Sequence, residues 1–242
     1  VYVAGRYDRP ALEAALRRAF QDWHEGPPPT DLPARASETA QLALVDSPGA
    51  PQSSVRIAVP VPDPAHALYF PTTLMNSLLG GTFGSRITTN IREDKGYSYS
   101  PGSSLNARRG GALWVLSAEI TAEHTAAALT EIFREVERLQ HEAPADAELL
   151  SVKNYRAGVF VISNSSPGGV LGQLAFMDLH GLPDDFLTHW VARIRAVTPA
   201  QVSEMARQFI RPERMSVVVA GDVATMGDAV RALPQFKNVP VR

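Results

Sequence analysis

The sequence predicts an α+β fold in which a mixed, largely antiparallel sheet is covered by helices. One observation is a set of short runs with alternating apolar residues, typical of half-buried strands: Gln41–Val45, Ser53–Val59, Tyr97–Asn106, Gly111–Ile120 and Met215–Gly221. The other is a long stretch between the last two runs in which apolar residues recur at helical spacing. At 242 residues and 45% hydrophobic composition, the chain is long enough to bury a core.

Composition excludes several classes of protein. A net charge of -2 argues against binding to nucleic acid, which favours basic surfaces. No apolar run approaches the roughly 20 residues of a membrane span. The absence of cysteine excludes disulfides, thiolate metal sites and cysteine nucleophiles. It does not identify the cellular compartment, and our expectation is the bacterial cell envelope or periplasm.

The first residues predict a separate unit. Val1–Gly5 (VYVAG) has the pattern of a buried strand, and Pro10–Trp23 that of an amphipathic helix. The following Gly26–Pro33 is rich in proline and cannot continue a helix. Because the chain opens in a strand-like run without Met, we expect it to be part of a longer polypeptide.

The start of the chain resembles its end. VYVAG at Val1 and VVVAG at Val217 are each followed by a helical pattern. Strand–glycine–helix units are common in α/β proteins, which is the simpler explanation. The alternative is a pair of related modules in tandem. Residues 1–23 would then be the last strand and helix of a preceding module, 24–37 a linker, and 38–242 a complete module.

The central elements follow from local signals. His66–Leu79 is expected to be helical and to end at Gly80-Gly81, and a second helix is expected from Ser85 to Lys95. A strand is expected to open at Tyr97 and to form a hairpin with Gly111–Ile120. The later helices are expected at Ala122–Gln140, Asp146–Ser163, Gly168–Leu179, Phe186–Ala196 and from Pro199 to about Ile210, the last with Thr198 as its N-cap.

Sequence motifs for a self-contained catalytic site are missing. The six histidines, none in a His-x-x-x-His or His-x-x-Glu-His pair, are His24, His66, His124, His141, His180 and His189. No Gly-x-Ser-x-Gly elbow occurs, and the glycine-rich Gly80–Ser85 lacks the lysine of a phosphate loop. Glu93, Asp94 and Glu119 are candidate acids, but their spacing predicts no mechanism. We therefore expect no metal ligands in this chain.

Arg92 and Tyr99 are the candidate binding residues. A guanidinium offers five donors in a fixed fork and a phenol adds one, so together they could hold peptide carbonyls or a developing oxyanion. Tyr97 would share a strand face with Tyr99 under strict alternation, so either tyrosine could be the partner. The simpler alternative is a solvated arginine at a helix end and a tyrosine in the core.

The segment Leu78–Ser100 resembles the insulinase/pitrilysin family of zinc metallopeptidases. The non-catalytic module of that family has a Leu-Gly-Gly-Gly-x-x-Ser-Arg-Leu, Leu-Arg-Glu and Gly-x-x-Tyr-Ser pattern. This chain reads LGGTFGSRI, IRE and GYSYS in the same order. The spacing from Arg92 to Tyr99 matches the Arg/Tyr pair of the family, whereas Tyr97 stands where the family tolerates varied residues.

The resemblance implies that two half-modules have different roles. One half-module carries His-x-x-Glu-His, binds zinc and activates water, whereas the partner half supplies the Arg/Tyr pair. This chain resembles the partner half. Arg92, Tyr99 and Tyr97 would then bind an unfolded peptide, with zinc on the catalytic half-module, in the same polypeptide or a neighbouring subunit. The alternative is a structural or assembly subunit with no proteolytic role.

Overall fold

The computed structural model describes residues 1–27, 37 and 39–241. The predicted linker, residues 24–37, falls largely outside these described residues. The helix α1 (Arg9–Ala19) precedes the linker. It begins one residue before the predicted helix Pro10–Trp23 and otherwise lies inside it. The prediction of a strand at Val1–Gly5 is wrong: no strand is assigned there, and the Val1 side chain is 85% exposed. A strand forms only where its backbone pairs with a neighbour, and Val1–Gly5 has no such neighbour among the described residues. The proposed preceding module stays a prediction.

The sheet is mixed and mostly antiparallel, as predicted. Among the described residues, its five strands are arranged in the order β1-β5-β2-β4-β3, and β1 with β5 is the one parallel pair of these strands. The strands are β1 (Gln41–Asp46), β2 (Gln52–Val61), β3 (Gly102–Arg108), β4 (Gly111–Thr121) and β5 (Ser216–Gly221). The hairpin and the central strands follow the predicted alternation, because one face of the sheet is buried and the other is not.

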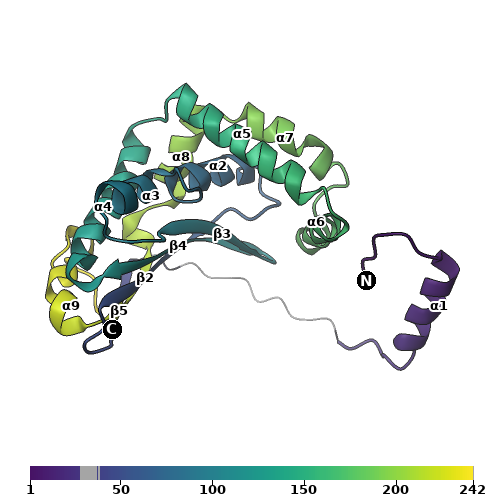
Figure 1. The fold of residues 1–242 in the computed structure, drawn as a ribbon, viewed down its shortest axis with the longest axis horizontal. Helices are drawn as coiled ribbons and strands as arrows, with labels where there is room; N and C mark the ends of the chain where they lie inside the picture. The colour runs from purple at the N-terminus through teal and green to yellow at the C-terminus, as the bar shows by residue number, and fades with distance from the viewer. Residues whose placement is uncertain (28–36, 38, 242) are drawn as a thin grey trace.

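The buried face of the sheet forms the core with the helices above it. In β4 the side chains of Trp114, Leu116, Ala118 and Ile120 are buried and alternate with partly exposed ones. The covering helices α2 (Tyr69–Leu79), α4 (Thr125–His141) and α8 (Pro199–Phe209) lie on one side of the sheet (Figure 1). Their contacts with β3, β4 and β2 close this layer.

The remaining helices extend this layer. They are α3 (Arg86–Thr88), α5 (Asp146–Ser163), α6 (Pro167–His180), α7 (Phe186–Ala196) and α9 (Val223–Arg231), with short turns at Ala122–His124, Pro212–Arg214 and Pro234–Phe236. The bounds of α5 and α7 agree with the prediction. At the start of α8, Thr198 forms the predicted N-cap and a reciprocal capping box with Gln201. No helix among the described residues is long and apolar enough to span a membrane.

The strand predicted from Tyr97 begins later. β3 starts at Gly102, and the preceding residues make only an isolated bridge to β4, between Ser98 and Ile120. Gly96 just before this segment has φ +66°, which turns the chain, and Pro101 has no amide hydrogen to give to a ladder. Tyr97 and Tyr99 therefore do not lie on a regular strand, and the predicted alternation does not apply to them.

Candidate binding site around Arg92

Arg92 lies on a short helix that changes type along its length. The first turn is α3, and the helix continues as a π-helical segment, η1 (Thr89–Asp94). Ile87 and Ile91 are fully buried and fix one side of this helix in the core. A π-helical turn changes the direction of the side chains that follow it and is frequent at functional sites. The sequence pattern predicts a helix here, but not its π-helical end.

The chain reverses directly after this helix and returns along it. Gly96 is in the left-handed conformation, and the amides of Tyr97 and Ser98 both donate to the carbonyl oxygen of Ile91, at 2.9 and 3.3 Å. The Ser98 hydroxyl is anchored on β4, where it donates to the Glu119 carbonyl at 2.7 Å. The turn therefore carries Tyr99 back over the end of the helix that holds Arg92.

Arg92 contacts two exposed aromatic rings. Its guanidinium carbon lies 4.8 Å from the centre of the Tyr99 ring and 4.6 Å from that of Phe83. Its Nε forms an ion pair of 3.0 Å with Glu93. Aromatic stacking occupies the faces of a guanidinium and leaves the in-plane N–H groups to bind acceptors. In the described part of the chain, the two terminal amino groups of Arg92 have no protein hydrogen-bond partner.

The two predicted tyrosines have different surroundings. Tyr99 is 78% exposed beside Arg92, whereas Tyr97 is half-buried and its ring stacks on that of His124 at 4.7 Å. The structure therefore brings Arg92 together with Tyr99 and not with Tyr97. The expectation that Tyr97 and Tyr99 share a face is wrong, because the turn at Gly96 replaces a strand with a bend.

Phe83 is a member of this site that the sequence reasoning missed. It lies in the loop between α2 and α3, and its side chain is 67% exposed despite being apolar. It also lines a cleft of about 360 Å³ between this loop and α5, formed by Leu78, Thr82, Phe83, Gly84, Glu148, Ser151, Val152 and Tyr155. An aromatic residue inside a glycine-rich loop is the signal that could have indicated it, since such loops lie on the surface.

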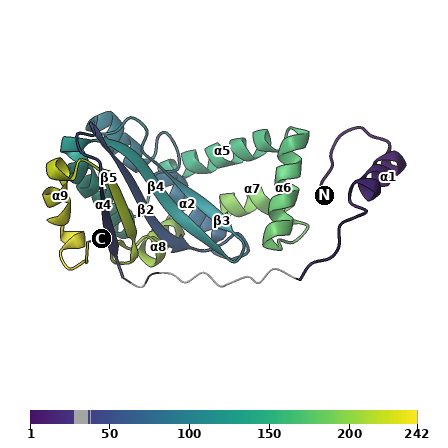
Figure 2. The ribbon, with the colours of Figure 1, turned by 90° about the horizontal axis from the view of Figure 1, so that it is seen from below.

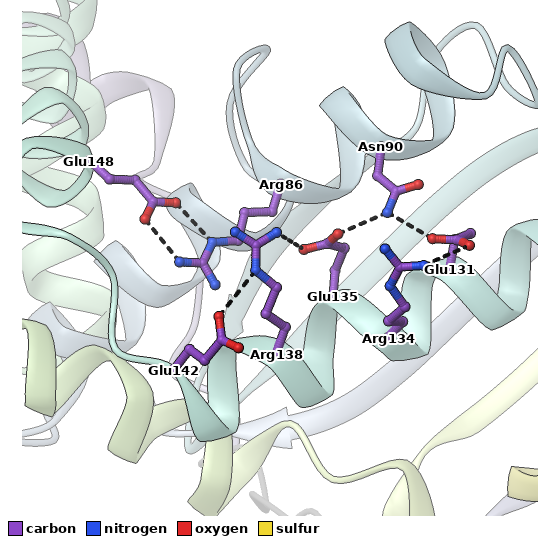
Figure 3. Close-up of polar contacts among 8 residues, drawn as sticks. All are labelled: Arg86, Asn90, Glu131, Arg134, Glu135, Arg138, Glu142 and Glu148. Carbon is purple, nitrogen blue, oxygen red and sulfur yellow. Dashed lines mark hydrogen bonds and ion pairs between the residues drawn. The ribbon is translucent and has the colours of Figure 1, made fainter.

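A network of polar side chains holds the Arg92 helix in place (Figure 3). Arg86 at its start donates two hydrogen bonds to Glu148 of α5, at 2.8 and 2.9 Å. Asn90 in its middle donates to Glu131 and Glu135 of α4, at 2.9 and 2.8 Å. The helix is thus tied to two neighbouring helices, which limits the positions open to Arg92.

Arg86 and Glu148 shift each other's pKa. The hydrogen bonds from Arg86 lower the pKa of Glu148, and those same bonds raise the pKa of Arg86. The side chain of Arg86 is only 8% exposed, so its charge depends on this partner. Arg138 adds ion pairs to Glu135 and Glu142, which extend the network along α4.

Two of the three candidate acids form ion pairs with arginines, and the third, Asp94, is exposed. Glu93 pairs with Arg92, whereas Glu119 on β4 pairs with Arg56 at 3.3 Å and accepts a hydrogen bond from Ser54. Within residues 1–27, 37 and 39–241, no group of three or more His, Asp or Glu residues is placed to hold a metal ion. The arrangement around Arg92 offers hydrogen-bond donors and aromatic surface, which suit binding.

Comparison with protein families gives a match over more than half of the chain. Residues 1–155, which include Arg92 and Tyr99, match the family described as peptidase M16 inactive domain. An uncharacterized zinc protease of Mycobacterium leprae is 25% identical over 244 residues, covering 98% of this chain and 54% of that protein. The chain thus spans about half the length of the curated relatives it matches.

Solved structures share the fold. A peptidase M16 inactive domain from Pseudomonas fluorescens superposes with a TM-score of 0.78 at 24% identity, covering 89% of this chain and 52% of that one. A chain of complex III2 from Candida albicans superposes with a TM-score of 0.73 at 18% identity, covering 92% and 54%. These likenesses support the α+β architecture described above.

Proposed function

The chain belongs to the peptidase M16 family as an inactive domain, and we propose that it is the substrate-binding half of a zinc peptidase. The family resemblance inferred from Leu78–Ser100 is thereby confirmed. In the proposal, this half binds an unfolded peptide, and a zinc-bearing partner half cleaves it. The expected partner is in the same polypeptide or in a neighbouring subunit.

The observation that carries this proposal is the contact between Arg92 and Tyr99. The ring of Tyr99 covers a face of the guanidinium, and the terminal N–H groups of Arg92, unlike its Nε–H beside Glu93, remain available to acceptors. Peptide carbonyls are such acceptors, and an oxyanion that develops during attack on the peptide bond is a stronger one. Since Tyr99 is largely exposed, its hydroxyl can donate to the same substrate.

The test is the replacement Arg92→Ala in the full-length protein, with its catalytic half present. Peptide turnover should fall by about 10²–10³-fold, the scale for losing one oxyanion donor. Arg231→Ala is the control, because Arg231 is likewise an arginine at the surface that pairs with a nearby carboxylate, Asp228 on α9. Wild-type turnover in the Arg92 variant would overturn the proposal.

A second experiment separates the halves. The 242-residue chain alone should not cleave peptides, and zinc should be found with the partner half. Metal content and peptide cleavage are measured for this chain alone, for the partner half alone, and for their mixture. Stoichiometric zinc and cleavage by this chain alone would contradict the proposed division of labour.

A structural or assembly subunit is the second candidate. It is favoured by the similarity to a chain of complex III2, which shares the fold. In that case the parent protein and its neighbouring gene would both lack His-x-x-Glu-His, and the chain would be isolated in a larger complex. Arg92→Ala would then leave the properties of the complex unchanged.

A further inference from the structure

A cavity of about 270 Å³ lies between α2, α5, α6 and α7. The ribbon shows that α6 joins α5 to α7 at the end of the layer that covers the sheet (Figure 2). Its lining combines aromatic rings with a few polar groups: Tyr69, Arg156, Val159, Phe160, Ser163, Gly172, Gln173, Phe176, Phe186 and Trp190. A small cavity with apolar walls and few polar groups is the usual form of a ligand site.

The walls are built by residues one helical turn apart. On α5, Arg156, Phe160 and Ser163 recur at intervals of four and three, which places them on one face. The rings of Phe160 and Trp190 stack with their centres 4.5 Å apart and their planes at 4°. This stack forms a flat, rigid aromatic surface at one side of the cavity.

Arg156 is the unusual member of this lining. Its Nε is buried and has no hydrogen-bond partner among the described residues. Arg156 also forms no ion pair within that part of the chain, and its guanidinium carbon lies 5.8 Å from the centre of the Trp190 ring. A partly buried guanidinium without a carboxylate partner is costly, because desolvation is not compensated by an opposite charge.

The environment of the cavity is consistent with an unmet charge. Burial lowers the pKa of the Arg156 guanidinium. Burial also raises the pKa of Tyr69, which lines the same cavity, and the positive charge of Arg156 partly offsets that rise. Among the described residues, no Asp or Glu lines the cavity. An anion that enters would therefore meet the guanidinium without competition from a carboxylate of the lining.

We propose that this cavity binds a carboxylate attached to an aromatic or aliphatic body. The planar carboxylate would pair with the Arg156 guanidinium, whose fork geometry matches it. The apolar body would lie against the Phe160–Trp190 stack and Phe176. A phosphate is less suited, since the described lining offers one guanidinium and no lysine. The same chemistry is present in a free aryl carboxylic acid and in the C-terminal residue of a peptide.

This site is independent of the proposed function. It shares no lining residue with the cleft beside Phe83, and Arg92 and Tyr99 take no part in it. Loss of peptide turnover in an Arg92 variant and loss of carboxylate binding in an Arg156 variant are therefore separate results.

The experiment uses the intact 242-residue chain and pairs of probes that share one body and carry either a carboxylate or a neutral amide. One pair is 3-phenylpropionate and 3-phenylpropanamide. The other is a short peptide ending in a free phenylalanine and its C-terminal amide. Binding is followed by NMR through the Arg156 Nε–H signal, assigned by its loss in Arg156→Met, and through the Trp190 indole signal.

The acids should shift both signals and bind at least about tenfold more tightly than the neutral amides, as expected for a charge-assisted pair. Preference for the free acid over the peptide would identify a small-molecule site, and the reverse a peptide-end site. Arg156→Met should weaken binding of the acid by about tenfold to a hundredfold, whereas Arg231→Met should not change it.

Three outcomes would overturn the proposal. Two are measured on the wild-type chain and do not depend on whether the variant folds: equal binding of acid and amide, and no binding of either acid at millimolar concentration. The third is unchanged affinity for the acid in a folded Arg156→Met. If the role of Arg156 is only structural, beside Trp190, Arg156→Met should be less stable than the wild type, and the wild-type chain should bind acid and amide equally well.

Discussion

Two hydrogen bonds from Arg86 to Glu148, at 2.8 and 2.9 Å, join the helix that carries Arg92 to α5. The pair spans 62 positions of sequence, and its carboxylate, Glu148, also lines the cleft beside Phe83. Because Arg86 is nearly buried while Glu148 is partly exposed, the charge of the arginine depends mainly on this carboxylate. The pair thus stabilises the fold and positions the candidate site at the same time.

Glu148→Gln should destabilise the chain at neutral pH. The loss should be about 1–3 kcal/mol, because it leaves Arg86 with a neutral partner, and the exposure of Glu148 limits the effect. The measurement is urea unfolding at pH 7. Glu204→Gln, which alters an exposed pair with Arg207, is the control and should cost less than about 1 kcal/mol. Equal losses in the two variants would contradict a special role of the buried pair.

The same pair predicts a dependence of stability on acid. The pKa of Glu148 is lower in the folded chain, so the unfolded chain takes up its proton first as pH falls. The stabilisation is complete above the ordinary carboxyl pKa of about 4.3 and is lost as pH falls through the lowered folded-state value. The difference in unfolding free energy between wild type and Glu148→Gln should therefore shrink as pH falls below that range. A constant difference down to pH 2 would contradict this assignment.

The two tyrosines allow a direct test of which one binds substrate. Tyr99→Phe keeps the ring that contacts Arg92 but removes the exposed hydroxyl, so peptide turnover by the full-length protein should fall by about tenfold. Tyr97→Phe is the matched control and should have little effect, because its ring stacks on His124 away from Arg92. Steady-state turnover of one peptide is measured for both. A larger loss in Tyr97→Phe would reverse the assignment made from the structure.

Sequence patterns predict those helices whose ends depend on residues close by in the chain. The bounds of α5 and α7 and the cap at Thr198 agree with the structure, since periodicity and capping act within a few residues. The spacing of Arg92 and Tyr99 also predicts that they lie together. The prediction places Tyr99 on a strand, whereas the structure places it after the turn at Gly96. The strand predicted at Val1–Gly5 fails for the opposite reason: a strand depends on a neighbour that its own residues do not specify.

The parts that could not be predicted depend on distant elements. Phe83 becomes part of a cleft only because α5 packs beside its loop, and Arg86 finds its partner 62 positions away. The cavity at Arg156 requires three more helices, and no motif in α5 alone indicates it. The π-helical end of the Arg92 helix likewise leaves no pattern, since its residues keep an ordinary helical spacing.

Removal of the Phe83 ring should weaken peptide binding. Phe83→Ala leaves Arg92 with a single aromatic neighbour, and affinity should fall by about twofold to fivefold, as expected for one exposed cation–π contact. Phe83→Tyr keeps the ring and should bind as wild type does. Phe20→Ala, which removes a ring that contacts Trp23 after α1, is the control. Affinity is measured by titration of a non-cleaved peptide, and unchanged binding in Phe83→Ala would exclude Phe83 from the site.

Gly96 provides the last test, because its left-handed backbone turns the chain that carries Tyr99. Its φ of +66° disfavours any side chain, while no atom beyond its two chain neighbours lies within 4 Å of the position that an added methyl group would take, so the backbone conformation opposes a substitution. Gly96→Ala should therefore cost about 1–2 kcal/mol and move Tyr99 away from Arg92.

Gly158 is the matched control for this change. It lies inside α5, also has no atom within 4 Å of the added carbon, and has no positive φ, so Gly158→Ala should stabilise the chain by about 0.5–1 kcal/mol. Urea unfolding gives both values, and the chemical shifts of the Tyr99 ring report its distance from the guanidinium. If Gly96→Ala were as stable as wild type with an unchanged Tyr99 signal, the left-handed turn would not be what holds the Arg92–Tyr99 pair together.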